Sequence, residues 1–513
     1  MGRQGGEDLR EGGVGIAEED LEDGSGEEWG VTTRPRNRSR GKVVLGGIGV
    51  GLLATALALT LAFTVGGVGE GSGGSPSGSQ SVRRSLIENP DVATSGQSPK
   101  CDVVVEAAQF FNVSRVAGTE STVVTNKYNK RAYVLTPEGA SDEAVRAKNL
   151  TELDLVPSGY ETAYLRTPLR NITVAETQLI TYVELLGYRS AISSFSQYGT
   201  SPCLNKMKEE GLTTSFAGNV YDFSGSQLNG TGPTFVGYMS NGDIAPETIQ
   251  FAVSAEQKDG SMLGTSEWIK FFAPFFGQEC AANDIFGKVK ERYECHKSKV
   301  SVFARDFDPI KVAVVQKSFP YDYGPTMKSD GYFKVSDSAY WSEYIKDAGA
   351  TPLIETSAVD GLTASNGYVF NLSDPEGFHA LLEQADVVID ETYMQNITAE
   401  KIVEAYNITD ESKFKFIQDK ALWRSDRRIN DNSPAGDDWF EARYPEADVL
   451  LEDIIFALHP TYSGLIINPK HSLTWMRNMY SAPAQEVLTS ALCTDVDQPT
   501  PLIADDCRSL NLN

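Results

Sequence analysis

The sequence predicts an α/β protein of two Rossmann-like lobes bridged by a long backbone helix, with a transmembrane helix near the N-terminus. Three observations support this fold class. Two series of short β-branched runs alternate with segments of helical periodicity, a pattern typical of parallel sheets covered by helices. A long stretch with one apolar stripe separates the two series. An uncharged run at 43–69 precedes both of them.

The first 100 residues divide into three parts. Residues 1–42 are acidic and then basic, with "RPRNRSRGK" at 34–42, and too few apolar side chains to fold, so we expect a disordered cytoplasmic tail. Residues 43–69 hold no charge and exceed the ~20 residues that span a bilayer, which predicts a transmembrane signal anchor. Residues 70–100 form a flexible Gly/Ser-rich linker.

The basic flank of the predicted anchor indicates its orientation. Lys and Arg on the N-terminal side place that end in the cytoplasm. We therefore expect a single-pass type II protein of the plasma membrane or an endosomal membrane, with its C-terminal domain extracellular or lumenal. The alternative is a long cleavable signal peptide. The net charge of −25 argues against a nucleic-acid partner.

Cysteines and glycosylation sequons agree with an exterior location. The cysteines all follow the uncharged run and are disulfide candidates: Cys101, Cys203, Cys280, Cys295, Cys493 and Cys507. Cys280 with Cys295 and Cys493 with Cys507 could close short loops, which would leave Cys101 with Cys203, but the sequence leaves the connectivity open. The N-x-S/T sequons are Asn112, Asn149, Asn171, Asn229, Asn371, Asn396 and Asn407.

Ordered structure is expected from Cys101 onward. Residues 101–264 form the N-terminal α/β lobe, with strands at 131–135 and 191–196 and a helix at 175–188 that ends near Gly187. Residues 265–300 are largely helical, with a turn or kink at Pro274, and are predicted to be the bridging helix.

Residues 301–513 form the C-terminal α/β lobe with a C-terminal extension. Strands are predicted at 311–319, 367–372, 386–393 and 413–418, and helices at 338–350, 375–385, 398–406 and 445–459. In open α/β sheets ligands bind beyond the carboxyl ends of the strands. Two facing lobes would therefore place both sets of strand-end loops around one cleft.

Catalytic and metal motifs are missing from the sequence. It contains no G-x-S-x-G, H-E-x-x-H, P-loop, C-x-x-C or post-strand G-x-G-x-x-G motif. Its four histidines include no pair at i,i+4 spacing, so no metal site is predicted. Acidic pairs such as Asp390-Glu391 and Asp437-Asp438 are expected by coincidence in a chain with 70 acids. We predict neither an enzyme nor a catalytic cofactor.

The segment "DWFEARYPEADVLLEDIIFALHP" resembles the helical-backbone class of periplasmic substrate-binding proteins, in which two α/β lobes are joined by a rigid helix. Within that class it is most similar to the bacterial cobalamin-binding receptor and the algal cobalamin acquisition proteins. The segments at 169–187, 193–202 and 236–249 are similar to the first lobe of this class. The connecting region is longer than in the bacterial receptors.

The resemblance implies capture of cobalamin, a transported ligand with apolar faces and a rim of amides, in a cleft between the lobes. Aromatic side chains just past predicted strands are the expected contacts: Phe195, Tyr198, Tyr238, Phe319, Tyr321, Tyr323, Tyr393, Trp423 and Trp439. Glu391 and Thr392 are expected at the rim. Trp439-Phe440 is interpreted as the edge of the cleft, with Phe440 the more buried of the two.

Three arginines bear on whether the expected ligand is anionic or uncharged. Arg424, Arg427 and Arg428 follow the predicted strand at 413–418 and would suit an anionic iron–siderophore or haem if they pointed into the cleft. Solvated arginines on an acidic surface are the alternative. A non-transport extracellular ectodomain on the same scaffold is the third possibility. Whatever the ligand, uptake would also need a membrane transporter or endocytic receptor as partner.

Overall fold

The computed structural model describes most of the chain from Cys101 onward. The described residues are 101–216, 233–236, 250–252, 259, 261–306, 308–322, 328–354, 368–394, 397–431, 436–468, 471–481, 485–503 and 507. All of them belong to one structural unit, Ile48–Asn513. The predicted tail, anchor and linker, residues 1–100, lie outside the described residues.

The expected membrane location is corrected. Among the described residues, no helix is both long enough and apolar enough to cross a bilayer. The segment at 43–69, on which the prediction of a type II anchor in the plasma or an endosomal membrane depended, lies outside the described part of the chain. We therefore do not carry that location further.

The first lobe is built on a parallel sheet with strand order β7-β6-β5-β8-β9. The strands are Ile172–Val174 (β5), Ile192–Ser196 (β6), Thr214–Phe216 (β7), Thr234–Val236 (β8) and Gln250–Ala252 (β9). Helices α3 (Ile180–Leu185) and α4 (Pro202–Glu209) make the crossovers after β5 and β6. The predicted parallel α/β arrangement is confirmed for this lobe.

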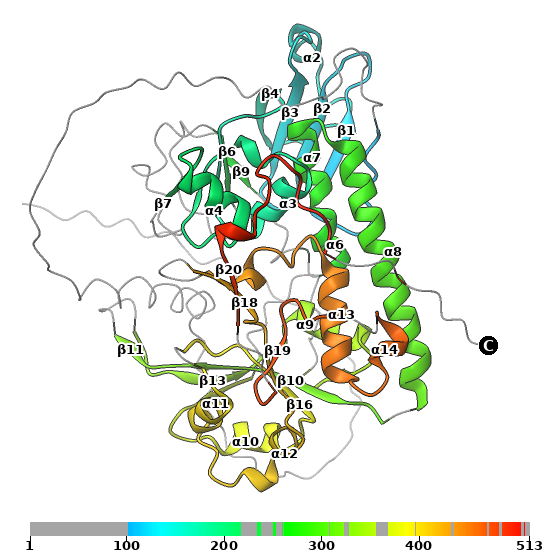
Figure 1. Ribbon diagram of the computed structural model, residues 1–513. Coiled ribbons are helices and arrows are strands. Elements are labelled where there is room, and N and C mark those ends of the chain that lie inside the picture. Colours follow the sequence, from blue (N-terminus) through cyan, green and yellow to red (C-terminus); the bar gives the residue numbers. More distant parts are fainter. Residues whose placement is uncertain are drawn as a thin grey trace, which may run out of the picture. The chain divides into compact units, whose positions relative to one another are not determined.

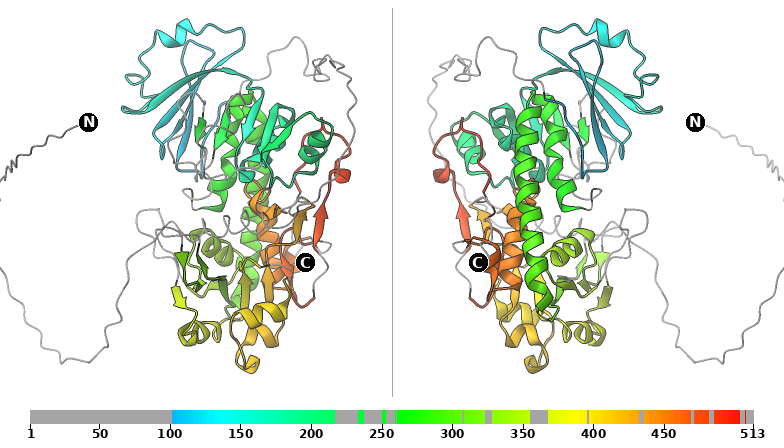
Figure 2. Two further views of the ribbon diagram at one scale, coloured as in Figure 1. Left: turned by 90° about the vertical axis from the view of Figure 1, so that its left-hand side faces the viewer. Right: turned by 90° about the vertical axis from the view of Figure 1, so that its right-hand side faces the viewer.

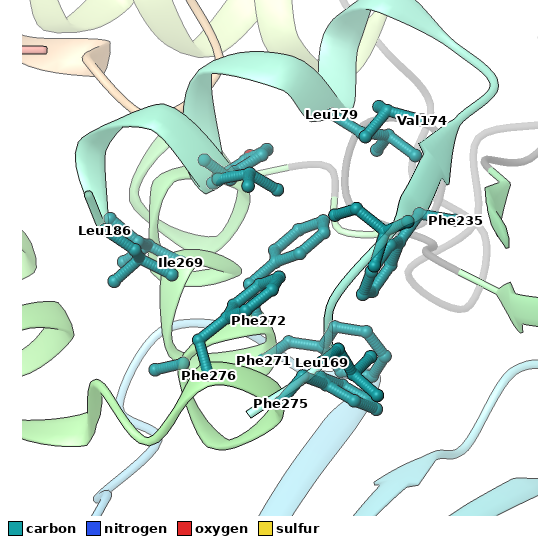
Figure 3. Packing of buried hydrophobic residues seen from close by; sticks show 14 of the residues in the cluster. Leu169, Val174, Leu179, Leu186, Phe235, Ile269, Phe271, Phe272, Phe275 and Phe276 are labelled. Atoms are coloured by element: carbon teal, nitrogen blue, oxygen red, sulfur yellow. The ribbon is translucent and has the colours of Figure 1, made fainter. Parts of the chain in front are cut away.

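Helix α7, Ile269–Phe276, supplies most of the aromatic core of the first lobe. Phe271, Phe272, Phe275 and Phe276 are all buried, and their rings gather around Phe235 of β8 (Figure 3). The ring centroids of Phe272 and Phe235 lie 5.2 Å apart. Because the helix is apolar on nearly all sides, it belongs inside the lobe rather than on its surface.

A second sheet, which the sequence did not predict, precedes this lobe. Its order is β1-β2-β3-β4, with strands Phe111–Arg115, Thr122–Asn126, Arg131–Pro137 and Glu161–Thr167. One face packs Phe111, Tyr133 and Leu135 onto the α7 core, and the other face has a small core around Val134 and Val145 of α2 (Glu143–Arg146).

The predicted bridging helix at 265–300 is divided into three helices. These are α6 (Met262–Glu267), α7 and α8 (Glu279–Phe303). The chain turns after α7 because Gly277 adopts φ +69°, a left-handed conformation that glycine tolerates. α8 bridges the lobes: it packs on α7 of the first lobe and on α13 (Ala447–Leu458) of the second (Figure 1), and α6 likewise contacts both α7 and α13.

The second lobe is built on a mixed sheet in the order β15-β13-β10-β16-β17-β19, with β14 beside β10. The central strands β10, β14, β16 and β17 are parallel, whereas β13, β15 and β19 are antiparallel to their neighbours. The strands are Lys311–Ser318 (β10), Tyr332–Val335 (β13), Thr351–Pro352 (β14), Tyr368–Asn371 (β15), Val387–Asp390 (β16), Leu422–Arg424 (β17) and Arg477–Asn478 (β19).

Both faces of this sheet are covered. One core contains α13 and α9, and the other contains α10, α11 and α12. The helices are Ala339–Asp347 (α9), Glu376–Leu382 (α10), Ala399–Ala405 (α11), Lys415–Gln418 (α12) and Ser463–Ile466 (α14). The strand predicted at 413–418 is wrong: this segment is a 3-10 turn, Glu411–Lys413, followed by α12, and the sheet strand is β17.

The disulfides join distant parts of the chain. Cys101 pairs with Cys280, Cys203 with Cys493, and Cys295 with Cys507, across sequence separations of 179, 290 and 212 residues. The short-loop pairing considered from the sequence is therefore wrong. The second and third disulfides tie the C-terminal extension to α4 and to α8.

A partly buried carboxyl where α9 meets α6 gives the fold a pH dependence. Burial, followed by repulsion from Asp347, raises the pKa of Glu343 to about 7, while the Met262 amide, which donates to its carboxylate at 3.2 Å, acts in the opposite direction. Between pH ~4.5 and ~7 the folded chain retains a proton that the unfolded chain has released, so this contribution to stability is lost as the pH rises.

We expect Glu343→Gln to raise the unfolding free energy at pH 8 by about 1–3 kcal/mol and to change it little at pH 4.5, because the amide removes the charge but keeps an acceptor for Met262. Thermal melts at both pH values measure this. Glu383→Gln, which changes an exposed carboxyl, is the matched control. Equal effects of Glu343→Gln at both pH values would contradict the prediction.

Candidate functional site

The carboxyl ends of the central strands from both lobes meet at the candidate site. Tyr198 follows β6 of the first lobe, and Tyr393 follows β16 of the second. Burial and then the nearby Tyr198 phenol raise the pKa of Tyr393, so the two rings lie close enough to interact electrostatically. The structure thus brings together two of the predicted contact residues from opposite lobes.

Polar contacts join the lobes beside these tyrosines. The amides of Thr200 and Ser201 donate to the Glu441 carboxylate at 2.5 and 2.9 Å, and the Thr200 hydroxyl donates to Asp438 at 2.8 Å. A Cβ on Gly436 would lie 1.9 Å from the carbonyl oxygen of Tyr198. Only glycine therefore permits the two loops to approach so closely.

The lobe contact is rich in buried acids. Burial raises the pKa of Asp438, Glu441 and Asp437, and repulsion between Asp438 and Glu441 adds to the shift of Glu441. The amides from Thr200 and Ser201 oppose that shift, since they donate to the carboxylate. This region of the site favours neutral or hydrogen-bonding groups over further negative charge.

Several aromatic side chains remain available to a ligand. Phe319, which follows β10, is 42% exposed, Tyr393 is 42% exposed and Phe440 is 52% exposed. Tyr198 and Tyr321 are partly exposed. Tyr321 lies in β11 (Tyr321–Asp322), which pairs with β12 (Lys328–Ser329).

The prediction for Trp439-Phe440 is reversed. Trp439 is 1% exposed, stacks on Trp341 of α9 with centroids 5.2 Å apart, and lies 4.6 Å from the Arg443 guanidinium. Phe440 is the exposed member of the pair. Both residues lie in the 3-10 turn Asp438–Phe440. The Trp439 indole packs on Trp341, whereas the Phe440 ring is exposed to solvent.

Glu391, a predicted rim contact, directly follows β16. The Trp341 indole donates to its Oε1 at 2.9 Å and the Tyr340 hydroxyl donates to the same atom at 3.3 Å. Burial raises the pKa of Glu391, and these two donors oppose that shift. Its neighbour Thr392 is fully buried and accepts the Lys317 amide at 2.9 Å, so Thr392 supports the strand instead of lining the rim.

Two predicted contact residues belong to the lobe cores. Phe195 is fully buried within β6 and packs in the core of the first lobe. Trp423, in β17, is 6% exposed and packs in the core that contains α13. Both residues lie within strands of the central sheets, and their side chains pack in the lobe cores and not at the strand ends.

The predicted arginines all have partners inside the second lobe. Arg424 donates to Asp390, to Asp426 at 3.0 Å and to the carbonyl of Thr392 at 2.9 Å. Arg427 donates to the carbonyl of Leu473 at 2.6 Å and Arg428 donates to Glu486 at 3.1 Å. The interpretation of Arg424 as a ligand-facing cation is therefore corrected: it is buried in an ion-pair network.

Some predicted residues lie outside the described part of the chain, namely Tyr238, Tyr323, Asn229 and Asn396. The other sequon asparagines, Asn112, Asn149, Asn171, Asn371 and Asn407, are all exposed, as a glycan would require, and their modification stays a prediction. Among the described residues no cluster of His, Cys, Asp or Glu could hold a metal ion. A cavity of about 330 Å³ beside Cys101 and Arg115 belongs to β1, β2 and the start of α8, away from the strand ends.

The sequence analysis missed Tyr340, Trp341 and Arg443. Tyr340 and Trp341 begin α9, and Arg443 stands between the rings of Trp439, Tyr340 and Tyr444. The available signal was the aromatic pair at the start of a predicted helix. It was interpreted only as part of the helix at 338–350.

No protein-family model and no curated protein matches the chain. Solved structures of periplasmic binding proteins are similar to it. A periplasmic heme-binding protein from Pseudomonas aeruginosa has 13% identity and a TM-score of 0.38, over 57% of this chain and 94% of that chain. The periplasmic vitamin B12 binding protein BtuF of Vibrio cholerae has 10% identity and a TM-score of 0.37, over 57% and 97%. Helicobacter pylori CeuE with Ni(II) bound has 13% identity and a TM-score of 0.40, over 60% and 89%.

Proposed function

We propose that this protein captures a bulky, uncharged solute of the cobalamin class between its two lobes, without chemistry. The observation that carries the proposal is that Tyr198 and Tyr393, from opposite lobes, lie near each other at the carboxyl ends of β6 and β16. The bridging helix α8 contacts both lobes, so the solute would be held between rigid bodies with small hinge movements.

Aromatic surface supports a ligand with apolar faces. Phe319, Tyr393 and Phe440 are large, exposed, and placed on loops that follow strands or join the lobes. Full burial of an aromatic side chain removes on the order of 150–250 Å² from water, and a flat ligand on one of these half-exposed rings would remove a part of that area. Glu391, held by Trp341 and Tyr340 through one oxygen, offers its other oxygen to an amide at the ligand's rim.

Charge supports an uncharged ligand over an anionic one. Arg424 is committed to Asp390 and Asp426, and buried acids at the lobe contact would repel carboxylates or catecholates. The segments 237–249, 323–327 and 432–435, which lie outside the described residues, contain no Lys or Arg. An anionic haem or ferric siderophore would need cations that these residues do not supply.

The phenols also bear on a haem ligand. A tyrosine that coordinates ferric iron does so as phenolate. The raised pKa of Tyr393 disfavours that form, because burial and the Tyr198 phenol both oppose a negative charge there. Hydrogen bonding by the neutral hydroxyl to a ligand amide carries no such cost.

We expect the purified full-length chain to bind cyanocobalamin as a one-to-one red complex, and Tyr198→Ala and Tyr393→Ala each to weaken binding by about tenfold or more, since each loses a contact worth at least ~1.4 kcal/mol. Equilibrium dialysis with absorbance detection gives both the stoichiometry and the dissociation constant. Tyr164→Ala, in β4 of the separate sheet, is the matched control and should bind as the unmodified chain does.

Haemin and a ferric catecholate siderophore are the comparison ligands in the same assay. Retention of either one, with no retained cyanocobalamin, would reject the cobalamin proposal in favour of the anionic ligand. Failure of all three would reject solute capture of these classes. Unchanged affinity in both tyrosine variants would move the binding site away from the Tyr198–Tyr393 pair.

A further inference from the structure

The C-terminal extension forms a strap, residues 485–503 and Cys507, that contacts both lobes in turn. It begins on the second lobe, where β20 (Glu486–Leu488) pairs in parallel with β18 (Arg428–Asn430). It then reaches the first lobe, where the short turn Ser490–Leu492 packs against α4. The views in Figure 2 show this segment running alongside both lobes.

On the first lobe the strap is held covalently and by a buried arginine. Cys493 forms the disulfide with Cys203 of α4, and its carbonyl accepts a hydrogen bond from Lys206 at 2.9 Å. Arg189, 4% exposed, donates to the carbonyls of Val496 and Gln498 at 2.8 Å each. It also donates to the Thr500 hydroxyl at 2.6 Å.

The strap then returns to the second lobe and the bridging helix. The amide of Ile503 donates to Glu446, the residue that precedes α13, at 2.6 Å. Cys507 closes the third disulfide with Cys295 of α8. The strap is therefore fixed at its start to the second lobe, at its middle to the first lobe, and at its end to Glu446 of the second lobe and to the bridging helix α8.

We propose that this strap is a second connection between the lobes that limits how far they separate. Its effect on ligand release rests on the proposed function; its effect on lobe separation does not. Four residues lie between Leu488, at the end of β20, and Cys493, so the two are five Cα–Cα steps apart and at ~3.5 Å per step can be separated by at most about 17 Å. Lobe opening must fit within that length as long as the Cys203–Cys493 disulfide is intact.

The lobes also meet through direct polar contacts. These include the Glu441 and Asp438 hydrogen bonds to Thr200 and Ser201, the hydrogen bond from the Asn430 side-chain amide to the carbonyl of Gly199 at 2.8 Å, and that from the Thr177 hydroxyl to the carbonyl of Phe440 at 3.1 Å. Gly436 also approaches Tyr198 closely. The helices α6 and α8 also contact elements of both lobes. The strap adds a covalent restraint at a second place, which lowers the population of open states.

Two variants of the full-length chain test the strap. Cys203→Ser with Cys493→Ser releases its middle, and insertion of Gly-Ser-Gly-Ser between Thr489 and Ser490 lengthens it by about 14 Å while keeping all disulfides. Amide hydrogen exchange, read without ligand, should become about tenfold or more faster at Thr200 and Ser201 and also at Glu441 and Ala442. The last two amides lie on the opposite lobe from Cys203, so local fraying of α4 does not explain their exchange.

Cys101→Ser with Cys280→Ser is the matched control, because it removes a disulfide that does not involve the strap. It should leave exchange at both loops unchanged. The insertion variant decides the outcome if the serine pair does not fold. Unchanged exchange at Glu441 and Ala442 in the insertion variant would overturn the proposal, as would an equal rise in the strands of both lobe cores.

The ligand arm of the experiment is separate. Cyanocobalamin should leave both strap variants about tenfold faster than it leaves the unmodified chain, as followed by stopped-flow displacement. If cyanocobalamin binds none of the proteins, the proposed function fails, while the exchange measurement still decides whether the strap restrains the lobes. If it binds and leaves all of them at one rate, the strap has no part in release.

Discussion

Replacing Arg424 by methionine is expected to lower the unfolding free energy by about 3–5 kcal/mol, the cost typical of removing one partner from a buried ion pair. Arg424 is 7% exposed and joins Asp390 to Asp426, while Asp426 also accepts two hydrogen bonds from Arg477 at 3.0 and 2.8 Å. Methionine fills much of the same space but leaves Asp390, itself fully buried, without its cation. Urea unfolding measures the loss.

The neighbouring arginine provides the control for this prediction. Arg428 lies only four residues along the chain, is partly exposed, and pairs with Glu486 at 3.1 Å. Arg428→Met should cost less than about 1 kcal/mol, as exposed pairs do. A double variant, Arg424→Met with Asp390→Asn, should recover part of the lost stability because the uncompensated carboxylate is then neutral.

The same pair of variants separates a structural role from a ligand role. If Arg424→Met remains as stable as the unmodified chain and loses only the binding of an anionic ligand, Arg424 faces the ligand and the buried network is not essential. Loss of stability without ligand present supports the network. This distinction matters because Arg424, together with Arg427 and Arg428, was the reason from sequence to consider an anionic ligand.

Strands with strong local patterns could be predicted from the sequence. The run at 311–318 is β-branched and buried along most of its length, so its neighbours hardly influence its structure. The segment at 413–418 shows the limit. Phe414 and Phe416 alternate like a strand, but both fill the core beneath the sheet from a helical turn. The strand of the sheet is β17, whose three residues are too few to show the alternation of apolar and polar side chains that identifies a strand.

Residues whose positions depend on distant partners could not be predicted. The choice between Trp439 and Phe440 is made by Trp341, nearly a hundred residues earlier, which stacks on the indole. Two of the disulfides likewise depend on where the strap meets α4 and α8, and the spacing of the cysteines in the sequence does not indicate those positions. Tyr198 and Tyr393 were predictable because each follows a recognisable strand, and strand ends share one edge of a sheet.

The largest effect at the lobe contact is expected at Glu441. Its carboxylate, 1% exposed, accepts the amides of Thr200 and Ser201 just before α4, where the positive end of the helix dipole favours an acceptor. Glu441→Ala leaves two buried amides without a partner, and each unsatisfied group costs about 1–3 kcal/mol. We therefore expect a total loss of about 2–4 kcal/mol in thermal or urea unfolding.

Glu441→Gln separates the hydrogen bonds from the charge. The amide oxygen accepts one of the two backbone donors, so about half of the loss should return. Burial and Asp438 raise the pKa of Glu441, so the glutamine variant should lose less relative stability at pH 8 than at pH 5, where the carboxyl is closer to neutral. Glu404→Ala, an exposed carboxyl on α11, should stay within about 0.5 kcal/mol of the unmodified chain. If Glu441→Ala matches that control, the lobes do not depend on this carboxylate, and the strap with α8 must hold them together.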